Sequence, residues 1–242
     1  FDSKPRLTKE NGKPFGLKME ATQFNSRGKT LASPWKFKNY GQAGIPISDL
    51  FPHVAKHADK LCLLNGMHTD LPAHAQAFVK MHTGNSQFVR PSLGAWTLYG
   101  LGTQNKNLPG FILLSPQTGF GGAQNYGSAF LPAIYQATPI HRSFRGGSGQ
   151  VNNIANRRIS RERQRIQLEL VQGLNAERLK QDQVNPAVEG VIESFELAFR
   201  MQSEVPQLMD VNKEPAAVRT AYGIGNRATD SFGRQCLLAR RM

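Results

Sequence analysis

The chain has 242 residues, which is enough for one sizeable hydrophobic core or for one core with an appended subdomain. Its hydrophobic fraction of 39% is compatible with a folded protein, and no apolar stretch approaches the roughly 20 residues of a membrane-spanning helix. The net charge of +13 attracts phosphates, but no zinc-finger spacing, basic leucine zipper or RNA-binding aromatic pattern is present, so nucleic acid is not an expected partner.

The N-terminal third begins without periodicity and then becomes regular. The first forty residues are rich in glycine, lysine and asparagine, which is typical of a long loop. Residues 47–60 predict a helix capped by Ser48. His53 and His57 lie four apart on it, a metal-binding spacing, but no third ligand is nearby and an exposed face is the better interpretation. The apolar run Leu61–Leu64 follows as a short strand buried on both faces.

A second helix and a second strand come next. The segment RPSLGAWTLYGLG predicts a helix that Ser92 caps, and Gly110–Leu114 is another short apolar run. Strand, helix and strand with short links are typical of a parallel α/β unit, so we expect Leu61–Leu64 and Phe111–Leu114 to be strands of one mainly parallel sheet. The glycine-rich stretch after Leu114 predicts loops, because its GFGG run lacks the spacing of a dinucleotide site.

The character becomes helical from Arg158 to about Tyr222. Apolar residues spaced three or four apart predict one stripe on each of two helices: Ile166, Leu170 and Leu174, then Val188, Ile192, Phe195 and Phe199. We interpret this span as a helical hairpin inserted in the core, and Thr229 or Asp230 caps the next core helix. The predicted organisation is a core part at 1–157, a helical insertion at 158–228 and the start of a core helix at 229–242.

The stretch NGMHTDLPAHAQAFVKMHTGN, residues 65–85, holds three histidines, two threonines and an aspartate. If Leu61–Leu64 is a central parallel strand, Thr69 lies at its carboxyl end, where ligand sites of open α/β sheets are found. A hydroxyl beside a helix N-terminus is placed to act as a nucleophile toward an anionic ester, with a divalent metal to activate it. His68, Asp70 and His74 are the candidate metal ligands.

Two further residues and one alternative belong to the same stretch. Asn85 and Arg90 are candidates for binding the substrate, because an amide and a guanidinium both donate hydrogen bonds to a tetrahedral anion. Alternatively, Thr69 or Asp70 only caps the following helix and His74 lies on its solvated side. The residues by themselves leave both interpretations open.

Blocks spread along the chain resemble a large family of exported bacterial proteins, the Domain of Unknown Function 1501 family, whose members are often labelled sulfatase-like. The similarity extends in order from Phe1 to Met242. It is carried by the runs FDSKP, ASPWKFKNYGQAGIPISDLFPHVAKHADKLCLLNGMHTD, TGN, RPSLGAWTLYGLG, NLPGFILLSP, ESFELAFRMQ and FGRQCLLARR.

The resemblance implies an alkaline-phosphatase-like fold: an α/β/α sandwich around a mainly parallel sheet, incomplete here and carrying the helical insertion. Members of the family are longer, and this chain opens at Phe1 and stops within FGRQCLLARRM, so we interpret it as their N-terminal half. The family is usually exported by the twin-arginine route, which implies a periplasmic or exported location.

In the wider superfamily, phosphodiesterases of the nucleotide-pyrophosphatase kind carry a threonine nucleophile after a core strand, followed closely by Asn-His. The run HTDLPAH resembles that pattern, with Thr69 at the nucleophile position. Here the histidine follows five residues later instead of four, and Ala73 stands where asparagine is expected. No Cys/Ser-x-Pro-x-Arg sulfatase signature is present, and the remaining metal ligands are expected upstream of Phe1 and downstream of Met242.

These features predict a metal-dependent hydrolase of phosphate or sulfate esters. Its cofactor would be a divalent metal (Zn, Ca or Mg), and its substrate a small-molecule or glycan ester. The alternative is a non-catalytic cell-surface or carbohydrate-associated protein that retains the fold, since one fold hosts many functions. The sequence leaves the substrate, the metal and the oligomeric state open.

Overall fold

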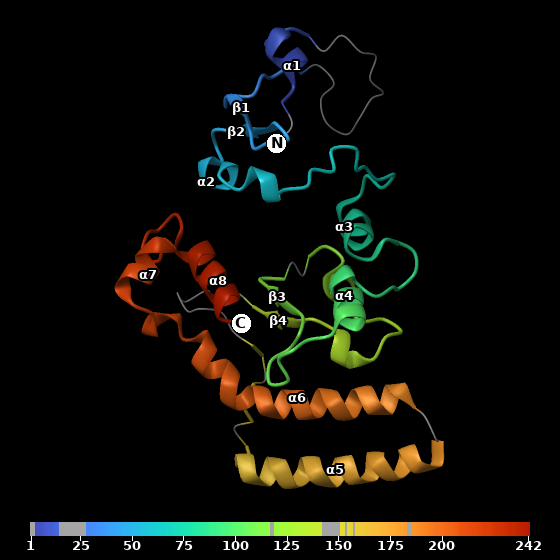
Figure 1. Ribbon diagram of the computed structural model, residues 1–242. Helices are drawn as coiled ribbons and strands as arrows, with labels where there is room; N and C mark the ends of the chain where they lie inside the picture. Colours follow the sequence, from blue (N-terminus) through green and yellow to red (C-terminus); the bar gives the residue numbers. More distant parts are fainter. Residues whose placement is uncertain are drawn as a thin grey trace. The chain divides into compact units, whose positions relative to one another are not determined.

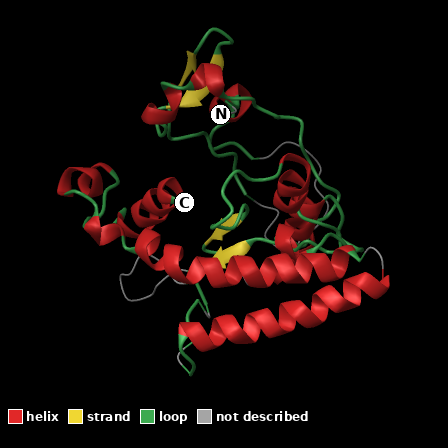
Figure 2. Cartoon of the chain, turned by 60° about the horizontal axis from the view of Figure 1, so that its bottom comes forward, coloured by secondary structure: helices red, strands yellow, loops and turns green. Residues whose placement is uncertain are grey.

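The chain folds into two compact units, Phe1–Thr69 and Asp70–Met242. The fold is mixed α/β and mostly helical, with two small two-stranded sheets in the described part of the chain (Figures 1 and 2). The computed structural model describes residues 3–14, 28–116, 119–141, 151–152, 154–156, 158–182 and 185–242. A large parallel sheet between helical layers is not found among these residues.

The first unit is built on a β-hairpin. Strands β1 (Phe37–Tyr40) and β2 (Ile45–Ser48) pair antiparallel through a tight turn. Helix α1 (Pro5–Lys9) precedes the hairpin, and α2 (Pro52–Ala55) and the 3₁₀-helix η1 (Ala58–Lys60) follow it. A small hydrophobic core joins the hairpin, α2 and η1, and its buried members are Ile47, Ala55 and Ala58.

The predicted helix over residues 47–60 is wrong in its extent. Ser48 ends β2, and its hydroxyl accepts a hydrogen bond from the amide of Leu50 at 3.2 Å, which makes a turn and not a helix cap. The helix begins only at Pro52, a residue suited to a first helical position because it lacks an amide proton. It ends at Ala55, so the exposed His53 and His57 do not share one continuous helix.

The predicted strand Leu61–Leu64 is also wrong. The amide of Leu61 donates to the carbonyl of Ala58 and closes the η1 turn, and no regular element follows as far as α3. Leu64 is 66% exposed. A strand needs a neighbour that takes up its backbone hydrogen bonds, and this run pairs with no strand in the described part of the chain, whatever its apolar composition.

The second unit opens with two helices, α3 (His74–Thr83) and α4 (Leu93–Leu101). The predicted cap of α4 is confirmed, because the Ser92 hydroxyl accepts a hydrogen bond from the amide of Ala95 at 3.3 Å. The predicted strand at Phe111–Leu114 is confirmed as β3 (Ile112–Leu114), which pairs in parallel with β4 (Thr138–Ile140). Two short 3₁₀-helices lie between these strands, η2 (Gly122–Asn125) and η3 (Ala133–Tyr135).

The helical hairpin predicted after Arg158 is present. Helix α5 (Arg161–Asp182) and helix α6 (Pro186–Met209) lie side by side and antiparallel (Figures 1 and 2). Ser160 caps α5 by accepting from the amide of Arg163, and Asn185 caps α6 by accepting from the amide of Val188, both at 3.3 Å. These caps explain where both helices begin.

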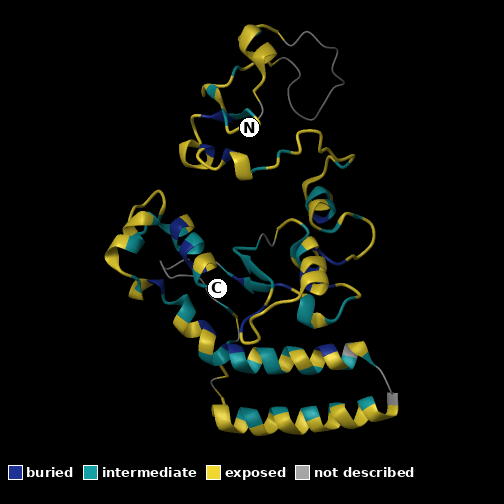
Figure 3. Cartoon of the chain, in the orientation of Figure 1, coloured by how far each residue is buried: buried dark blue, intermediate teal, exposed yellow. Residues whose placement is uncertain are grey.

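The two predicted apolar stripes differ in what covers them. On α6, Val188, Ile192 and Phe199 are partly shielded, whereas Phe195 remains 45% exposed. On α5 the stripe at Ile166, Leu170 and Leu174 is exposed to solvent (Figure 3). The side of α5 that meets α6 carries the polar Arg165 and Gln172 beside Leu168, so the predicted stripe is not the shielded side of this helix.

The most shielded face of α6 lies elsewhere. Met201 and Val205 on this face pack into a core with Leu108. Earlier on the helix the same face carries Gly190, where a Cβ atom would lie 2.6 Å from the Cβ of Pro132. A glycine here lets the helix approach the residues before η3 closely, a role that a count of apolar residues does not detect.

The C-terminal part completes the second unit. The 3₁₀-helix η4 (Val211–Lys213), α7 (Ala216–Ala221) and α8 (Asp230–Arg241) follow α6 in order. Val211, Leu237 and Leu238 are fully shielded and pack with Ile140 of β4, so the small parallel sheet is part of this core. No helix in the described part of the chain has both the length and the apolar character that crossing a membrane requires.

Candidate functional site

The predicted catalytic residues lie in an irregular segment and are divided between the two units. The boundary falls after Thr69, so His68 and Thr69 belong to the first unit, and Asp70 and His74 to the second. All four side chains are exposed to solvent. The following helix begins at His74 and not at Asp70, because its N-cap residue is Ala73.

In the first unit, the ring of His68 contacts the backbone. Nδ1 of His68 lies 3.2 Å from the carbonyl oxygen of Gly66, a contact that favours the tautomer with its proton on Nδ1. The Nε2 atom of that tautomer carries a lone pair, which is the form that binds a metal or accepts a proton. Thr69 follows directly, with its hydroxyl on an exposed residue.

In the second unit, Asp70 and His74 each contact another side chain. The carboxylate of Asp70 forms an ion pair with the ammonium group of Lys80 on α3. His74 is the first residue of α3, and its ring centroid lies 5.4 Å from that of Phe120. The charge of Asp70 is thus paired with that of a lysine, and the His74 ring packs at a tilt against an aromatic ring.

The predicted substrate-binding residues are part of the turn after α3. The amide oxygen of Asn85 accepts hydrogen bonds from the backbone amides of Gln87 and Phe88, both at 2.8 Å. The guanidinium of Arg90 lies 5.8 Å from the centre of the Phe88 ring, a cation–π distance. Asn85 shapes the turn, and Arg90 remains exposed and charged above it.

The predicted metal ligands are His68, Asp70 and His74. A divalent metal needs several oxygen or nitrogen ligands around one point. Over the described ranges, no three His, Cys, Asp or Glu residues are grouped so that they could hold an ion. A metal bound by these three residues therefore stays a prediction.

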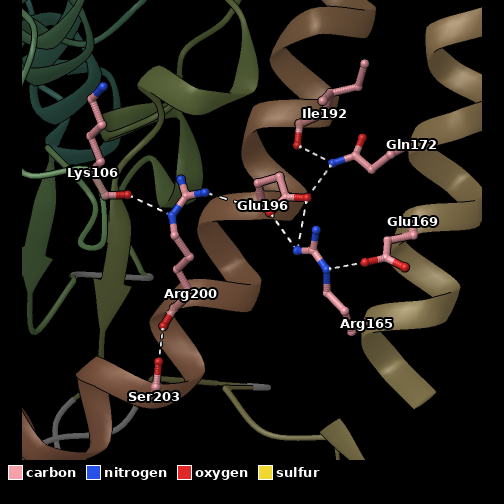
Figure 4. A network of polar contacts seen from close by, with 8 residues as sticks. All are labelled: Lys106, Arg165, Glu169, Gln172, Ile192, Glu196, Arg200 and Ser203. Carbon is pink, nitrogen blue, oxygen red and sulfur yellow. Dashed lines mark hydrogen bonds and ion pairs between the residues drawn. The ribbon is translucent and has the colours of Figure 1, made fainter. Parts of the chain in front are cut away.

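A different set of polar residues converges between α5 and α6 (Figure 4). The carboxylate of Glu196 accepts hydrogen bonds from Arg165 at 3.1 and 3.3 Å and from the amide of Gln172 at 3.3 Å. Arg165 also donates to Glu169 at 2.9 Å, and Arg200 on α6 donates to the carbonyl oxygen of Lys106. The network ties α5 to α6 and α6 to the loop before β3.

The network changes the protonation energetics of its central arginine. Hydrogen bonds to the carboxylates of Glu169 and then Glu196 raise the pKa of Arg165 above its ordinary value. The guanidinium is charged at every accessible pH, so this contact is structural and not an acid–base centre. Its role is to hold the two helices in register.

Beside this network lies a pocket of about 350 Å³. It is bordered by η3, the start of β4, the middle of α6, and the residues Val151, Asn152, Ile154 and Gln164. A second hollow of about 260 Å³ runs along the junction of α5 and α6 and shares Gln164, Ala198 and Gln202 with the pocket. Among the described residues, those that line the two hollows carry no charge.

A row of aromatic rings occupies the surface over α4 and the residues around η3. Trp96 makes edge-to-face contacts with Tyr99 and Phe130, with ring centroids 5.9 and 5.8 Å apart, and Tyr99 makes another with Tyr135 at 5.3 Å. Trp96 is 44%, Tyr99 53% and Phe130 62% exposed. The rings thus support one another while leaving much of their area to solvent.

The sequence motifs predicted neither the pocket nor the aromatic row. One feature of the sequence could have indicated both. From Pro91 to His141 the only charged residue is Lys106, in a chain that carries 47 charges, 30 basic and 17 acidic. Both features draw on this neutral stretch, the aromatic row entirely and the pocket in part. A long uncharged run in a highly charged protein is therefore the pattern that could have indicated them.

Comparison with known proteins gives one result. No curated protein matches the chain, and no solved structure matches it. The family model described as protein of unknown function DUF1501 matches residues 1–242. The chain belongs to the DUF1501 family.

Proposed function

We propose that the chain carries the nucleophile of a hydrolase of phosphate or sulfate esters, with Thr69 as the attacking residue. The observation that carries the proposal is the exposed run His68-Thr69-Asp70, which precedes a helix whose first residue is the further candidate His74. The residues before and after this hydroxyl carry an imidazole and a carboxylate, which are groups that assist nucleophilic attack.

The proposed reaction has two steps. Thr69 Oγ bonds to the phosphorus or sulfur atom, the bond to the alcohol oxygen breaks, and the alcohol leaves with the proton that the hydroxyl gives up. Water then attacks the threonine ester, which releases phosphate or sulfate and restores the hydroxyl. Asn85 and Arg90 are proposed to bind the anionic oxygens, since both carry hydrogen-bond donors.

The cofactor, the substrate class and the location are proposed from the sequence. We propose a divalent metal (Zn, Ca or Mg) as cofactor, a small-molecule or glycan ester as substrate, and a periplasmic or exported location. The parallel pair β3–β4 is proposed to belong to an alkaline-phosphatase-like sheet. Family membership adds no activity, because the family is described as one of unknown function.

A direct test is ester hydrolysis by wild type and by Thr69→Ala. The assay uses 4-methylumbelliferyl phosphate, bis(p-nitrophenyl) phosphate and 4-methylumbelliferyl sulfate, each with Zn²⁺, Ca²⁺ or Mg²⁺ added. Removing the nucleophile should lower kcat by about four orders of magnitude. Because Thr69 is exposed, the free energy of unfolding should change by less than about 0.5 kcal/mol.

The matched control is Thr220→Ala, which removes an exposed threonine from α7. This variant should hydrolyse the esters at the wild-type rate. Hydrolysis by Thr69→Ala at the wild-type rate, or no cleavage of any of the three esters by wild type with any of the metals, would refute the proposal.

The aromatic row favours a second function, that of a non-catalytic carbohydrate-associated protein. Exposed tryptophan and tyrosine rings present flat apolar faces with a polar atom at the edge, which suits the C–H faces and hydroxyl groups of sugars. The test is co-sedimentation with insoluble cellulose, chitin and xylan. Trp96→Ala should lower the bound fraction several-fold, whereas Phe232→Ala, which removes an exposed ring from α8, should leave it unchanged.

A further inference from the structure

The two hollows beside α6 form a neighbouring pair. The pocket and the α5–α6 hollow share Gln164 from α5 and Ala198 and Gln202 from α6. The shared residues form the border between them, so a ligand longer than the pocket would extend over this border. We call the pair the amide cleft, defined by the linings of the two hollows.

The polar groups of the amide cleft are neutral. The pocket is lined by the amides Gln136, Asn152, Gln164 and Gln202 and by the hydroxyl residues Thr138 and Ser194. An amide both donates and accepts hydrogen bonds, as does a hydroxyl. The Ser194 hydroxyl donates its proton to the carbonyl oxygen of Gly190 at 2.7 Å, so toward a ligand it acts as an acceptor.

Apolar surface completes the lining. Met201, Leu197 and Ile134 belong to the pocket, and the rings of Phe195 and Phe199 belong to the α5–α6 hollow. Two guanidiniums lie near Phe199: Arg161 at 5.1 Å and Arg165 at 5.4 Å from its ring centre. Arg165 is bonded to the carboxylate of Glu196, and Arg161 donates to the Ser203 hydroxyl, so each guanidinium has a hydrogen-bond partner outside the lining.

The neutral side chains of the described lining favour one class of ligand. A charged ligand would lose water on entering and gain no opposite charge in return, which is unfavourable. A neutral ligand with many hydroxyl groups exchanges water for amide and hydroxyl partners, and its C–H faces cover the apolar side chains. A volume of about 350 Å³ is near the small end of ligand pockets, so one sugar ring suits it.

We propose that the amide cleft binds a neutral oligosaccharide, with one sugar ring in the pocket among the four amides and the next ring in the α5–α6 hollow beside Phe195. The proposal rests on the carbohydrate-associated function and deepens it by naming a site apart from the aromatic row. It does not depend on ester hydrolysis.

The experiment titrates the full chain with cellobiose, xylobiose, mannobiose and N,N′-diacetylchitobiose by calorimetry. At least one of these should bind wild type. Gln202→Leu keeps the size of the side chain and removes its hydrogen bonds, so it should weaken binding about five- to tenfold. Ala198→Phe places a ring at the exposed border between the hollows and should abolish binding.

The matched control is Gln207→Leu, the same change at an exposed position of α6 that lines neither hollow. It should bind like wild type. A measurement free of substitutions uses the wild-type Met201 methyl signal, which should shift on sugar binding, whereas the methyl signal of the exposed Met81 on α3 should not.

Four results would overturn the proposal: none of the disaccharides binds, Gln202→Leu binds as tightly as wild type, the Met201 signal stays in place, or digalacturonate competes as well as the neutral sugars. Binding to insoluble polysaccharide that depends on Trp96, without disaccharide binding in the cleft, would refute the cleft and leave the carbohydrate-associated function standing.

Discussion

At the scale of single residues, Gly233 on α8 lies against the backbone of Tyr222. A Cβ atom at this position would lie 1.9 Å from the carbonyl oxygen of Tyr222, which follows α7. A backbone atom cannot move aside as the end of a flexible side chain can. The glycine therefore permits the packing of α8 against the end of α7, next to the fully shielded Leu237.

We expect Gly233→Ala to lower the free energy of unfolding by about 1–3 kcal/mol, because the added methyl group overpacks this contact. The matched control is Gly173→Ala on α5, where a Cβ atom meets nothing within 4 Å. Alanine there should stabilise by roughly 0.5–1 kcal/mol through its higher helix propensity. Urea denaturation measures both values, and a destabilisation that is equal in the two variants would contradict the expectation.

Asp230 gives the structure a defined pH dependence. Its carboxylate accepts from Arg234 at 2.9 Å and from the amide of Gly225 at 2.8 Å. These hydrogen bonds, the one to Arg234 first, lower the pKa of Asp230 below its ordinary value of 3.8. The stabilisation is therefore present above about pH 3.8 and is lost as the pH falls through the lower pKa of the folded state.

We expect Asp230→Asn to destabilise the protein at pH 7 by less than about 1 kcal/mol, since the ion pair is partly exposed. The difference from wild type should shrink as the pH falls below about 3.8, because the wild-type carboxylate then becomes protonated. Thermal unfolding of both proteins between pH 7 and pH 2.5 tests this. A difference that grows toward low pH would show that the sign is wrong.

At the scale of elements, α5 and α6 show how a helix pair is held without a fully apolar interface. The apolar stripe of α5 is exposed to solvent. Arg165 and Gln172 of α5 donate hydrogen bonds to the carboxylate of Glu196 on α6 (Figure 4). Glu196 also receives Arg200 from its own helix at 3.8 Å. One carboxylate thus organises donors from both helices, and each of these donors would lose one partner without it.

We expect Glu196→Ala to loosen α5 while leaving α6 on its core side in place. Amide hydrogen exchange in α5 should become about fivefold faster or more, because hydrogen bonds to a charged group are lost. The control Glu193→Ala removes an exposed carboxylate from the same helix and should leave exchange unchanged. Equal exchange of α5 in both variants would mean that the network contributes nothing to the pairing.

At the scale of the whole molecule, each unit has its own core. Ile47 is fully shielded in the first unit among residues of the hairpin and η1. Leu237 is fully shielded in the second unit with Leu238, Val211 and Ile140. Residues Phe1–Thr69 and Asp70–Met242 separate by their internal contacts, so we expect a core substitution to act mainly within its own unit.

We expect Ile47→Ala to cost about 2–5 kcal/mol and to speed amide exchange in β1, β2 and η1, because it leaves a cavity in a small core. Exchange in α8 should stay at the wild-type rate. Leu237→Ala should give the reverse pattern, with faster exchange in α8 and an unchanged hairpin. If either variant accelerates exchange equally in both units, the two cores unfold as one.

Local signals in the sequence determined several features correctly. Ser92 before an apolar run predicted the start of α4, and the short run at Phe111–Leu114 predicted β3. The helical character of residues 158–222 was also predictable, because helix periodicity extends over many residues there. Family membership followed from blocks along the entire chain. The cap, the strand and the helix periodicity each depend on residues close together in the sequence, and each family block is itself a short run.

The tertiary structure decided the features that depend on distant partners. Leu61–Leu64 has the composition of a strand, but a strand requires a neighbour to pair with, and none of the described residues supplies one. Of the predicted site residues, the metal-ligand candidate Asp70 is paired with Lys80 and the substrate-binding candidate Asn85 is bonded to its own turn, neither of which spacing reveals. Arg165 of α5 turns toward α6 because its partner Glu196 lies there, 31 residues along the chain. Pairing and burial are properties of two segments at once, and composition describes only one.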